Sequence, residues 1–191
     1  AEIHSTALDY SPRGAAVTPY FGDGAGVVVL GAAERPGLLA AVLHGDPTGF
    51  ERFWCEFPAS RNFPARMTRE AFEAGRHFYQ LDAAAVHPEA ERTLAGVTGE
   101  VLERADVAAD RVALFVMHYL DPRVARRAAE RCRLPADRVV ATAEAAGHVA
   151  AAGIPIALAD ALADGRVGDG DLVCCAAFGA GMSSAAALLR L

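Results

Sequence analysis

The chain has 191 residues, of which 53% are hydrophobic and 22% are charged, so it is long enough for one ordinary globular domain with its own core. Its formal net charge of −6 argues against a general nucleic-acid binder, which would normally present a basic face. No apolar run approaches the roughly 18 residues of a membrane-spanning helix, and the first residues lack the regions of a signal peptide. We therefore expect a cytoplasmic protein that binds neither nucleic acid nor membrane.

A glycine-rich turn, Phe21 to Gly26, leads into the apolar run Val27 to Leu30, and a second apolar run follows from Leu38 to His44. Two strands with a short connection predict a β-hairpin. A phosphate-binding loop would follow a strand and open a helix, whereas here a strand comes after the glycines. We therefore interpret the glycines as positions where two backbones approach closely.

The stretch from His44 to about Arg66 has no clear periodicity and predicts a long surface or pocket-lining loop. From Val86 to Ala105, apolar residues recur at three- and four-residue spacing, which predicts an amphipathic helix.

A short continuous apolar run from Val112 to Met117 is typical of a buried parallel strand, and it ends directly at His118. Asp121 and Pro122 then supply an N-cap and a first helical position for a helix through about Arg133. The remaining pattern predicts a strand, a helix and two closing strands, over Val139–Thr142, Ile154–Ala163, Leu172–Phe178 and Ala185–Leu191. This alternation predicts a single α/β domain with a mixed sheet and no internal repeat.

Two histidines follow neighbouring predicted strands. His118 lies at the carboxyl end of its strand, where α/β folds place ligands and reactive groups, and His148 follows the next strand after a turn at Gly147. The two imidazoles could converge beyond one edge of the sheet. Each histidine alone could equally be structural, as a satisfied buried side chain or as a loop residue.

A basic stripe follows His118, with arginines at helical spacing on one face of the predicted helix: Arg123, Arg126, Arg127 and Arg131. Such a stripe is usually a solvated face. On an acidic chain, beside a candidate site, it could instead dock an acidic partner or a phosphate-bearing ligand.

The four cysteines have neither a C-x-x-C pair nor a spacing typical of metal ligands, so the sequence predicts neither a metal site nor a disulfide framework. Cys174 and Cys175 lie within an apolar run, which favours small buried hydrophobic side chains over nucleophiles.

Several of these segments, in order and at similar spacing, resemble β-ketoacyl-acyl carrier protein (ACP) synthase III. Phe21 to Leu30 is similar to the family's F-G-D-G-A-G-A-V-V-L segment, and Ala113 to His118 is similar to the strand that leads to its catalytic histidine. Val139 to Pro155 is similar to the segment that carries G-N-T-S-A-A-S-x-P. The family's closing elements are matched by Gly165–Val167, Gly170–Val173 and Phe178–Gly181.

This resemblance implies the C-terminal half of a thiolase-like α/β fold, with a mixed five-stranded sheet covered by helices. It divides the chain into residues 1–15, the end of the N-terminal half, and residues 16–191, the C-terminal domain. It also implies that the nucleophile lies in the first half, outside this chain, since none of the four cysteines matches it. The implied partners are the missing N-terminal half and a second copy in a homodimer.

The resemblance further implies roles for named residues. His118 and His148 would be catalytic, with His148 in place of the family's asparagine, and the backbone N–H of Ala180 would help form an oxyanion hole. Asp121, in place of another asparagine, and Phe178 would line the pantetheine pocket. The arginines Arg123, Arg126 and Arg127 would dock the carrier protein. No metal or cofactor is implied, because acyl-CoA and malonyl-ACP are substrates.

The activity implied is the loading of a starter acyl group from acyl-CoA, through an acyl-enzyme, and its condensation with malonyl-ACP in polyketide or fatty-acid biosynthesis. One alternative is a non-condensing acyltransferase that passes the acyl group to a hydroxyl or amine of a small molecule, since a histidine can act as a general base where an asparagine cannot. Another alternative is an inactive thiolase-fold subunit that supports an active partner.

Overall fold

A five-stranded mixed sheet of order β3-β9-β8-β6-β7 forms the centre of the computed structural model, which describes residues 1–191. Strand β6 (Leu114–His118) runs parallel to β7 (Val139–Ala141) and to β8 (Leu172–Gly179). Strand β9 (Ser183–Arg190) is antiparallel to β8 and to β3 (Leu38–Gly45). The predicted α/β domain with a mixed sheet is confirmed.

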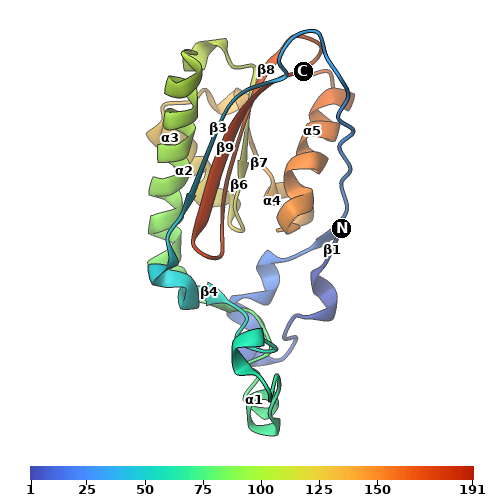
Figure 1. Ribbon diagram of the computed structural model, residues 1–191, viewed down its shortest axis with the longest axis vertical. Helices are drawn as coiled ribbons and strands as arrows, with labels where there is room; N and C mark the ends of the chain where they lie inside the picture. Colours follow the sequence, from blue (N-terminus) through green and yellow to red (C-terminus); the bar gives the residue numbers. More distant parts are fainter.

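Three helices cover this sheet. Helices α2 (Ala83–Ala105) and α3 (Pro122–Arg131) lie on one face, and α5 (Gly153–Ala163) lies on the other (Figure 1). The shorter elements are β1 (Glu2–Ile3), β2 (Asp23–Gly24), β4 (Phe53–Trp54), β5 (Gln80–Leu81), α1 (Arg69–Glu73), α4 (Ala143–Ala146) and the 3-10 turns η1 to η8. None of the helices combines the length and the apolar character that crossing a bilayer requires.

The helix boundaries follow from their caps. The Asp121 carboxylate accepts a hydrogen bond from the backbone N–H of Arg123 at 2.8 Å, and Pro122 occupies the first position of α3, where no N–H is needed. Helix α2 begins three residues before the predicted start, because Asp82 caps it by accepting from the N–H of Ala85 at 3.1 Å.

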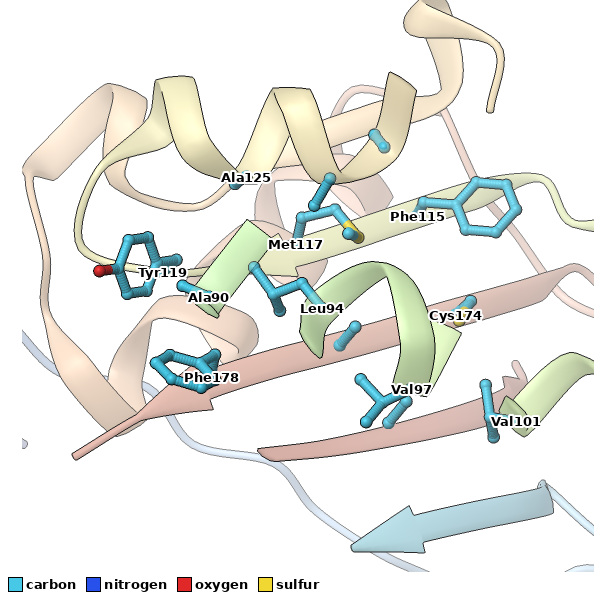
Figure 2. Packing of buried hydrophobic residues seen from close by; sticks show 14 of the residues in the cluster. Ala90, Leu94, Val97, Val101, Phe115, Met117, Tyr119, Ala125, Cys174 and Phe178 are labelled. Carbon is cyan, nitrogen blue, oxygen red and sulfur yellow. The ribbon is translucent and has the colours of Figure 1, made fainter. Parts of the chain in front are cut away.

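The main core lies between the sheet and helices α2 and α3 (Figure 2). Side chains alternate along β6, so Phe115 and Met117 pack in this core, whereas Leu114 and Val116 pack in a smaller cluster with α5. All of β6 is buried. The strand that ends at His118 is therefore held from both faces, which leaves its last side chain little freedom to move.

The predicted hairpin is wrong. Residues Val27 to Leu30 form no strand, and their exposed fractions range from 58% to 90%. Strand β3 pairs instead with β9, in a register that runs from Leu38 to Gly45. The segment between β2 and β3 passes along the α5 side of the sheet (Figure 1), where no strand lies beside it. The apolar pattern indicates a preference for extended backbone. Extended backbone becomes a β-strand only where a partner strand lies beside it.

Gly22 has the role that the sequence predicted, a close approach of two backbones, whereas Gly26 lies closest to a side chain. A Cβ atom on Gly22 would lie 1.9 Å from the carbonyl oxygen of Ala146, and one on Gly26 would lie 2.5 Å from the Cβ of Pro155. Both positions exclude any larger residue, so the segment 21–26 can lie directly against the chain around His148.

The predicted loop after β3 is mostly irregular, as expected. It holds η4 (Pro47–Arg52), the two-residue strand β4 and η5 (Ser60–Asn62). Strand β4 pairs with β5, and the segment between them projects beyond the end of the sheet (Figure 1). Trp54 and Tyr79 from this region reach the cavity described below.

Candidate active site

A cavity of about 650 Å³ opens at the carboxyl ends of β6 and β8. Aromatic side chains line part of it, and small alanine, glycine and serine residues line much of the rest. Four of the six histidines also line it: His4, His44, His118 and His148. Imidazole is therefore the main polar group that this cavity offers to a ligand.

His118 is held at the floor of the cavity with one ring nitrogen engaged. Its Nδ1 lies 2.7 Å from Oγ1 of Thr142, and its Nε2 has no protein partner and is open to the cavity. The side chain is only 7% exposed, and burial lowers the pKa of His118 to about 4. The ring is therefore neutral at physiological pH. If the Thr142 hydroxyl donates to Nδ1, the Nε2–H points toward a ligand.

His148 reaches the same place from the loop after α4. Gly147 has φ of 72°, and the backbone of His148 bonds to the segment before β2: its N–H donates to the Tyr20 carbonyl at 2.7 Å, and its carbonyl accepts from the Gly22 N–H at 3.1 Å. Its ring stacks on that of His118, with centroids 5.0 Å apart and planes at 28°. The structure thus brings together the two histidines that the sequence singled out.

The pKa of His148 is lowered to about 3, first by burial and then by the neighbouring imidazoles of His118 and His4. Two stacked rings in a buried site cannot both be positively charged at neutral pH, because the charges would repel with little solvent to screen them. As neutral rings, each can donate one N–H. Two such donors at one site can stabilise an oxygen atom that gains negative charge during a reaction.

These two imidazoles are expected to make the protein sensitive to mild acid. A histidine with pKa near 6.5 in the unfolded chain and near 4 or 3 in the fold binds more protons when unfolded, so stability rises with pH between these values. The stability that the two neutral imidazoles contribute is fully present above pH 6.5 and is lost as pH falls toward 4 and then 3. The pair contributes a slope of up to about 2.7 kcal/mol per pH unit.

Urea unfolding at pH 7 and at pH 5 measures this slope. Stability should fall less over the same interval in a His118→Asn, His148→Asn double variant, because asparagine does not titrate. An unchanged slope would show that other groups govern the acid sensitivity.

Phe178 and Ala180 lie beside the histidines. Phe178 is buried near the end of β8, where its ring meets that of Tyr119 edge-on at 5.8 Å. Ala180 lies in the turn between β8 and β9 and lines the cavity. Both therefore border the space that a ligand of His118 and His148 would occupy.

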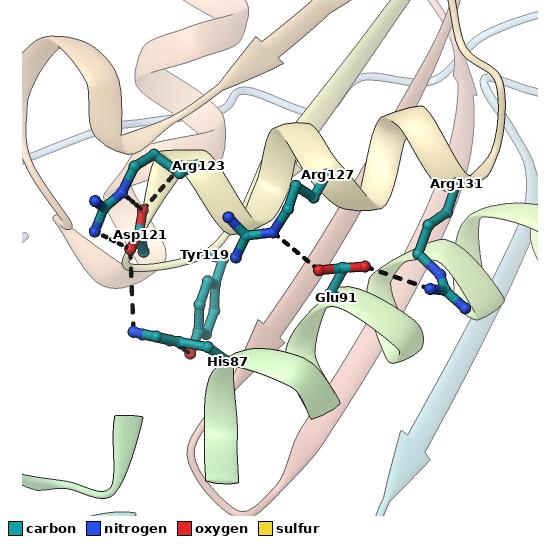
Figure 3. A network of polar contacts seen from close by, with 7 residues as sticks. All are labelled: His87, Glu91, Tyr119, Asp121, Arg123, Arg127 and Arg131. Atoms are coloured by element: carbon teal, nitrogen blue, oxygen red, sulfur yellow. Dashed lines mark hydrogen bonds and ion pairs between the residues drawn. The ribbon is translucent and has the colours of Figure 1, made fainter. Parts of the chain in front are cut away.

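Asp121 does not line this cavity. Its side chain is 2% exposed, and its two carboxylate oxygens accept hydrogen bonds from the Arg123 guanidinium at 3.1 and 2.8 Å (Figure 3). Burial alone would raise the pKa of Asp121, but the hydrogen bonds and charge of Arg123 outweigh it and hold the pKa below its ordinary value. His87 lies 4.0 Å from the same carboxylate and shares a 2.8 Å hydrogen bond with Tyr119.

The basic stripe on α3 is also paired within the chain. Arg126 bonds to Glu144 at 2.5 and 2.6 Å. Figure 3 shows Arg127 and Arg131, which both pair with Glu91 of α2, at 2.9 and 3.4 Å. These guanidinium groups remain about half exposed. The stripe is therefore a series of surface ion pairs, and a docking partner would have to exchange contacts with the carboxylates.

Three cavity or supporting residues carried no signal in the sequence. His4 and Tyr79 lie outside any periodic segment, and Thr142 looked like the last residue of a strand. Among the cysteines, only Cys55 lines the cavity, and its thiol donates toward the carbonyl oxygens of Phe57 and His77. Burial raises the pKa of Cys55, so it is held as a thiol.

The prediction that Cys174 and Cys175 are small buried hydrophobic residues is confirmed. They are 0% and 6% exposed, and burial raises the pKa of each thiol to about 12. Neither cysteine lines the cavity.

Residues 102–191 match the family profile described as 3-Oxoacyl-[acyl-carrier-protein (ACP)] synthase III C terminal. The beta-ketoacyl-[acyl-carrier-protein] synthase III of Synechococcus sp. (strain WH7803) is 36% identical over 191 residues, which are 100% of this chain and 56% of that protein. The corresponding synthase III of Thioalkalivibrio sulfidiphilus is 35% identical and is covered to the same 56%. The chain thus spans little more than half the length of these relatives.

Among solved structures, the 3-oxoacyl-[acyl-carrier-protein] synthase III of Aquifex aeolicus VF5 has a TM-score of 0.82 at 28% identity, covering 98% of this chain and 55% of that one. The priming beta-ketosynthase of the R1128 polyketide biosynthetic pathway has a TM-score of 0.71 at 24% identity, and the match covers 84% of this chain and 47% of that one. The predicted thiolase-like fold is therefore confirmed.

Proposed function

We propose, from the match of residues 102–191 to the C-terminal domain of 3-oxoacyl-ACP synthase III, that this chain is the C-terminal half of a condensing acyltransferase of that type. The observation that carries the proposal is the stacked pair of neutral imidazoles, His118 and His148, in a cavity at the carboxyl edge of the sheet. The complete enzyme would load a starter acyl group from acyl-CoA and condense it with malonyl-ACP.

The first half of the enzyme would supply the nucleophile and the surface that covers exposed apolar groups. Residues 1–15 would be the end of that half, and residues 16–191 the C-terminal domain. Two features support a missing neighbour: the exposed run from Val27 to Leu30, and Leu43 of β3, which is 77% exposed. Apolar surface of this extent is usually covered in a complete protein. The complete enzyme would act as a homodimer.

In the proposed reaction, the nucleophile attacks the acyl-CoA thioester, the C–S bond to CoA breaks, and CoA leaves as the free thiol. Malonyl-ACP then binds and loses CO₂, and the electron pair of the broken C–C bond passes to the thioester as an enolate. The enolate carbon attacks the acyl-enzyme carbonyl, and the collapse of that adduct releases the nucleophile. The product is β-ketoacyl-ACP. No metal or cofactor takes part in these steps.

His118 and His148 would act at the decarboxylation step. The thioester oxygen becomes negative as CO₂ leaves, and N–H donors from both Nε2 atoms would stabilise it. Burial supports this role, because a donor that is already oriented in a dry site needs no rearrangement as the charge develops. The backbone N–H of Ala180 would serve the acyl-transfer steps, and Phe178 would line the channel for the pantetheine arm. We take His148 to stand where the family carries asparagine.

A second candidate function follows from the chemistry of His148. An imidazole can accept a proton from a hydroxyl or an amine, so the enzyme could pass its acyl group to a small-molecule oxygen or nitrogen without decarboxylation. This candidate needs the opposite tautomer at His148, with a free lone pair at Nε2 facing the cavity.

Carrier-protein docking on α3 remains a proposal. The half-exposed guanidinium groups of Arg126 and Arg127 could exchange their present carboxylate partners for acidic groups of an acyl carrier protein. Arg123 is the most exposed of the three, at 76%, and its guanidinium clamps the buried Asp121. Asp121 itself would reach a pantetheine arm only if that clamp opened.

Incubation of the complete enzyme with a panel of acyl-CoAs and with malonyl-ACP tests the proposal. We expect a mass increase equal to one acyl group, followed by CO₂ release and formation of β-ketoacyl-ACP. An acyl-enzyme that forms without CO₂ release would favour the second candidate. No acyl-enzyme with any donor would contradict both and would point to an inactive supporting subunit.

Replacing His148 with asparagine separates the two roles of this residue. If His148 only donates a hydrogen bond, the amide N–H of asparagine can substitute, and condensation should fall by less than about 10-fold. If His148 is a general base, acyl transfer to a hydroxyl or amine should fall by about 10²-fold or more. Steady-state kinetics with each acceptor measures both losses.

A further inference from the structure

A third histidine stands behind His148. The ring of His4 lies 6.2 Å from that of His148, with planes at 21°, and it also packs against Phe21 and Tyr79 at 4.9 and 5.8 Å. The side chain is 7% exposed and lines the cavity. The ring of His148 is thus enclosed by His118, His4 and Phe21, all within the same aromatic cluster.

The backbone places His4 there through pairings with the glycine-rich segment. Strand β1 pairs with β2, with Ile3 opposite Asp23, and the Asp23 carboxylate accepts hydrogen bonds from the N–H and hydroxyl of Ser5 at 2.8 and 2.5 Å. A single parallel bridge then joins Phe21 to His148. His4 and His148 are therefore anchored to the two sides of one short segment, so their relative position is fixed by the backbone.

Each of these two rings has a buried nitrogen without a hydrogen-bond partner: Nε2 of His4 and Nδ1 of His148. A buried polar atom that stays unpaired costs about 1–3 kcal/mol, so such atoms are rare and usually have a reason. Only one other side-chain atom in the chain is in this state, Nδ1 of His77, and His77 does not line the cavity.

The surroundings of His4 decide which of its nitrogens carries the proton. The Tyr79 hydroxyl lies 3.3 Å from Nδ1 and has no other partner, so it can donate to that atom. The Glu2 carboxylate lies 4.0 Å from Nε2, too far for a hydrogen bond but near enough to favour a proton there. Both contacts favour His4 with N–H at Nε2. The unpaired Nδ1 of His148 can then act as the acceptor.

We propose that His4 is a positioning residue that holds His148 in the tautomer with N–H at Nε2, by donating from its own Nε2 to Nδ1 of His148. In the structure the two rings are stacked neighbours without a hydrogen bond, so the proposed bond requires one ring to rotate about its side-chain torsions. The Nε2–H of His148 then faces the cavity as a donor. This inference rests on the proposed function, and it favours condensation over general-base acyl transfer.

The three rings do not form a metal site, because no group of three or more histidine, cysteine or acidic side chains in the chain is arranged to hold an ion. A purely structural role for His4 is the competing explanation. Phenylalanine would satisfy that role, since it keeps the ring packing, whereas glutamine keeps a donor and loses the ring. The two substitutions therefore give opposite results under the two explanations.

The test uses the complete enzyme labelled with ¹⁵N at histidine. The ring nitrogen chemical shifts report each tautomer directly, and the His148→Asn variant assigns the His148 signals. In the parent protein we expect His148 with N–H at Nε2. The His4→Phe variant should show a mixture of tautomers at His148, and His4→Gln should keep the parent state. A matched control is His77→Phe, which removes the other buried unpaired imidazole and should leave the His148 signals unchanged.

Kinetics provides the second readout. His4→Phe should lower kcat by about 10-fold with little change in KM, and His4→Gln should recover most of this loss. In a His148→Asn background, His4→Phe should have no further effect, because its target is absent. An unchanged His148 tautomer in His4→Phe would overturn the proposal, as would equal losses in both backgrounds. The tautomer measurement needs no turnover, so it remains decisive if the enzyme fails to condense any substrate.

Discussion

Replacement of His118 with alanine is expected to lower kcat/KM for the proposed condensation by about 10²–10³-fold in the complete enzyme, the range found when one preorganised oxyanion donor is removed. The size of the effect follows from burial. His118 is 7% exposed and held by Thr142 at the end of a fully buried strand, so its N–H is oriented before the reaction begins. Water that fills the space would be a poorer donor, because it is not oriented.

The same variant separates the two half-reactions. In the proposed reaction, the backbone N–H of Ala180 and not the imidazoles would serve acyl transfer from acyl-CoA, so the acyl-enzyme should still form and be visible by intact mass. His77→Ala is the control, since the side chain of this histidine does not line the cavity. A loss of less than about 3-fold in condensation would show that His118 is not the donor. Loss of both half-reactions together would indicate a disturbed fold, which circular dichroism would detect.

Replacement of Gly153 with alanine is expected to reduce kcat for the proposed condensation by about 10²-fold without unfolding the protein. A Cβ atom there would lie 2.7 Å from Nδ1 and 2.8 Å from Cε1 of His118, and 3.3 Å from Oγ1 of Thr142. The ring cannot retreat, because it extends from the buried strand β6 and stacks on His148. A displacement of about 1 Å at a reacting group can cost 10²-fold in rate.

This substitution is informative because nothing else about it is unfavourable. Gly153 has ordinary helical angles, φ −62° and ψ −44°, so alanine brings no backbone strain and a helix preference of about 1 kcal/mol. Gly96 in helix α2 is the matched control, because a Cβ atom there meets nothing within 4 Å. Gly96→Ala should leave activity unchanged and raise stability slightly. Full activity in Gly153→Ala would show that the tight contact with His118 is not needed.

Much of the fold was predictable because its core elements are periodic over several residues. Strand β6 and helices α2, α3 and α5 were expected within a few residues of their observed bounds, since each buries an apolar face against the sheet. The hairpin prediction failed for the opposite reason. Residues Val27 to Leu30 have the composition of a strand, but composition contains no information about which strand will lie alongside.

The candidate site was likewise predictable only in part. His118 and His148 could be singled out because they follow neighbouring strands, and parallel strands bring their carboxyl ends to one edge of a sheet. His4 could not, since it enters through a two-residue ladder and a single bridge, neither of which leaves a pattern in the sequence. The arginines of α3 were interpreted as a solvated face or a docking stripe, whereas their pairing depends on where Glu91 and Glu144 lie in space.

The sequence by itself determined the order of the main strands and helices from α2 to β9, the caps of α3, the close backbone approach at Gly22 and the edge at which two histidines meet. These features depend on local preference and on periodicity, which act between residues near one another in the chain. Only the tertiary structure decided the partner of β3, the stacking of the imidazoles, the fit of Gly153 against His118 and the third ring at His4. Those features depend on distances of a few ångströms between segments far apart in the sequence, which are set by how the whole chain packs.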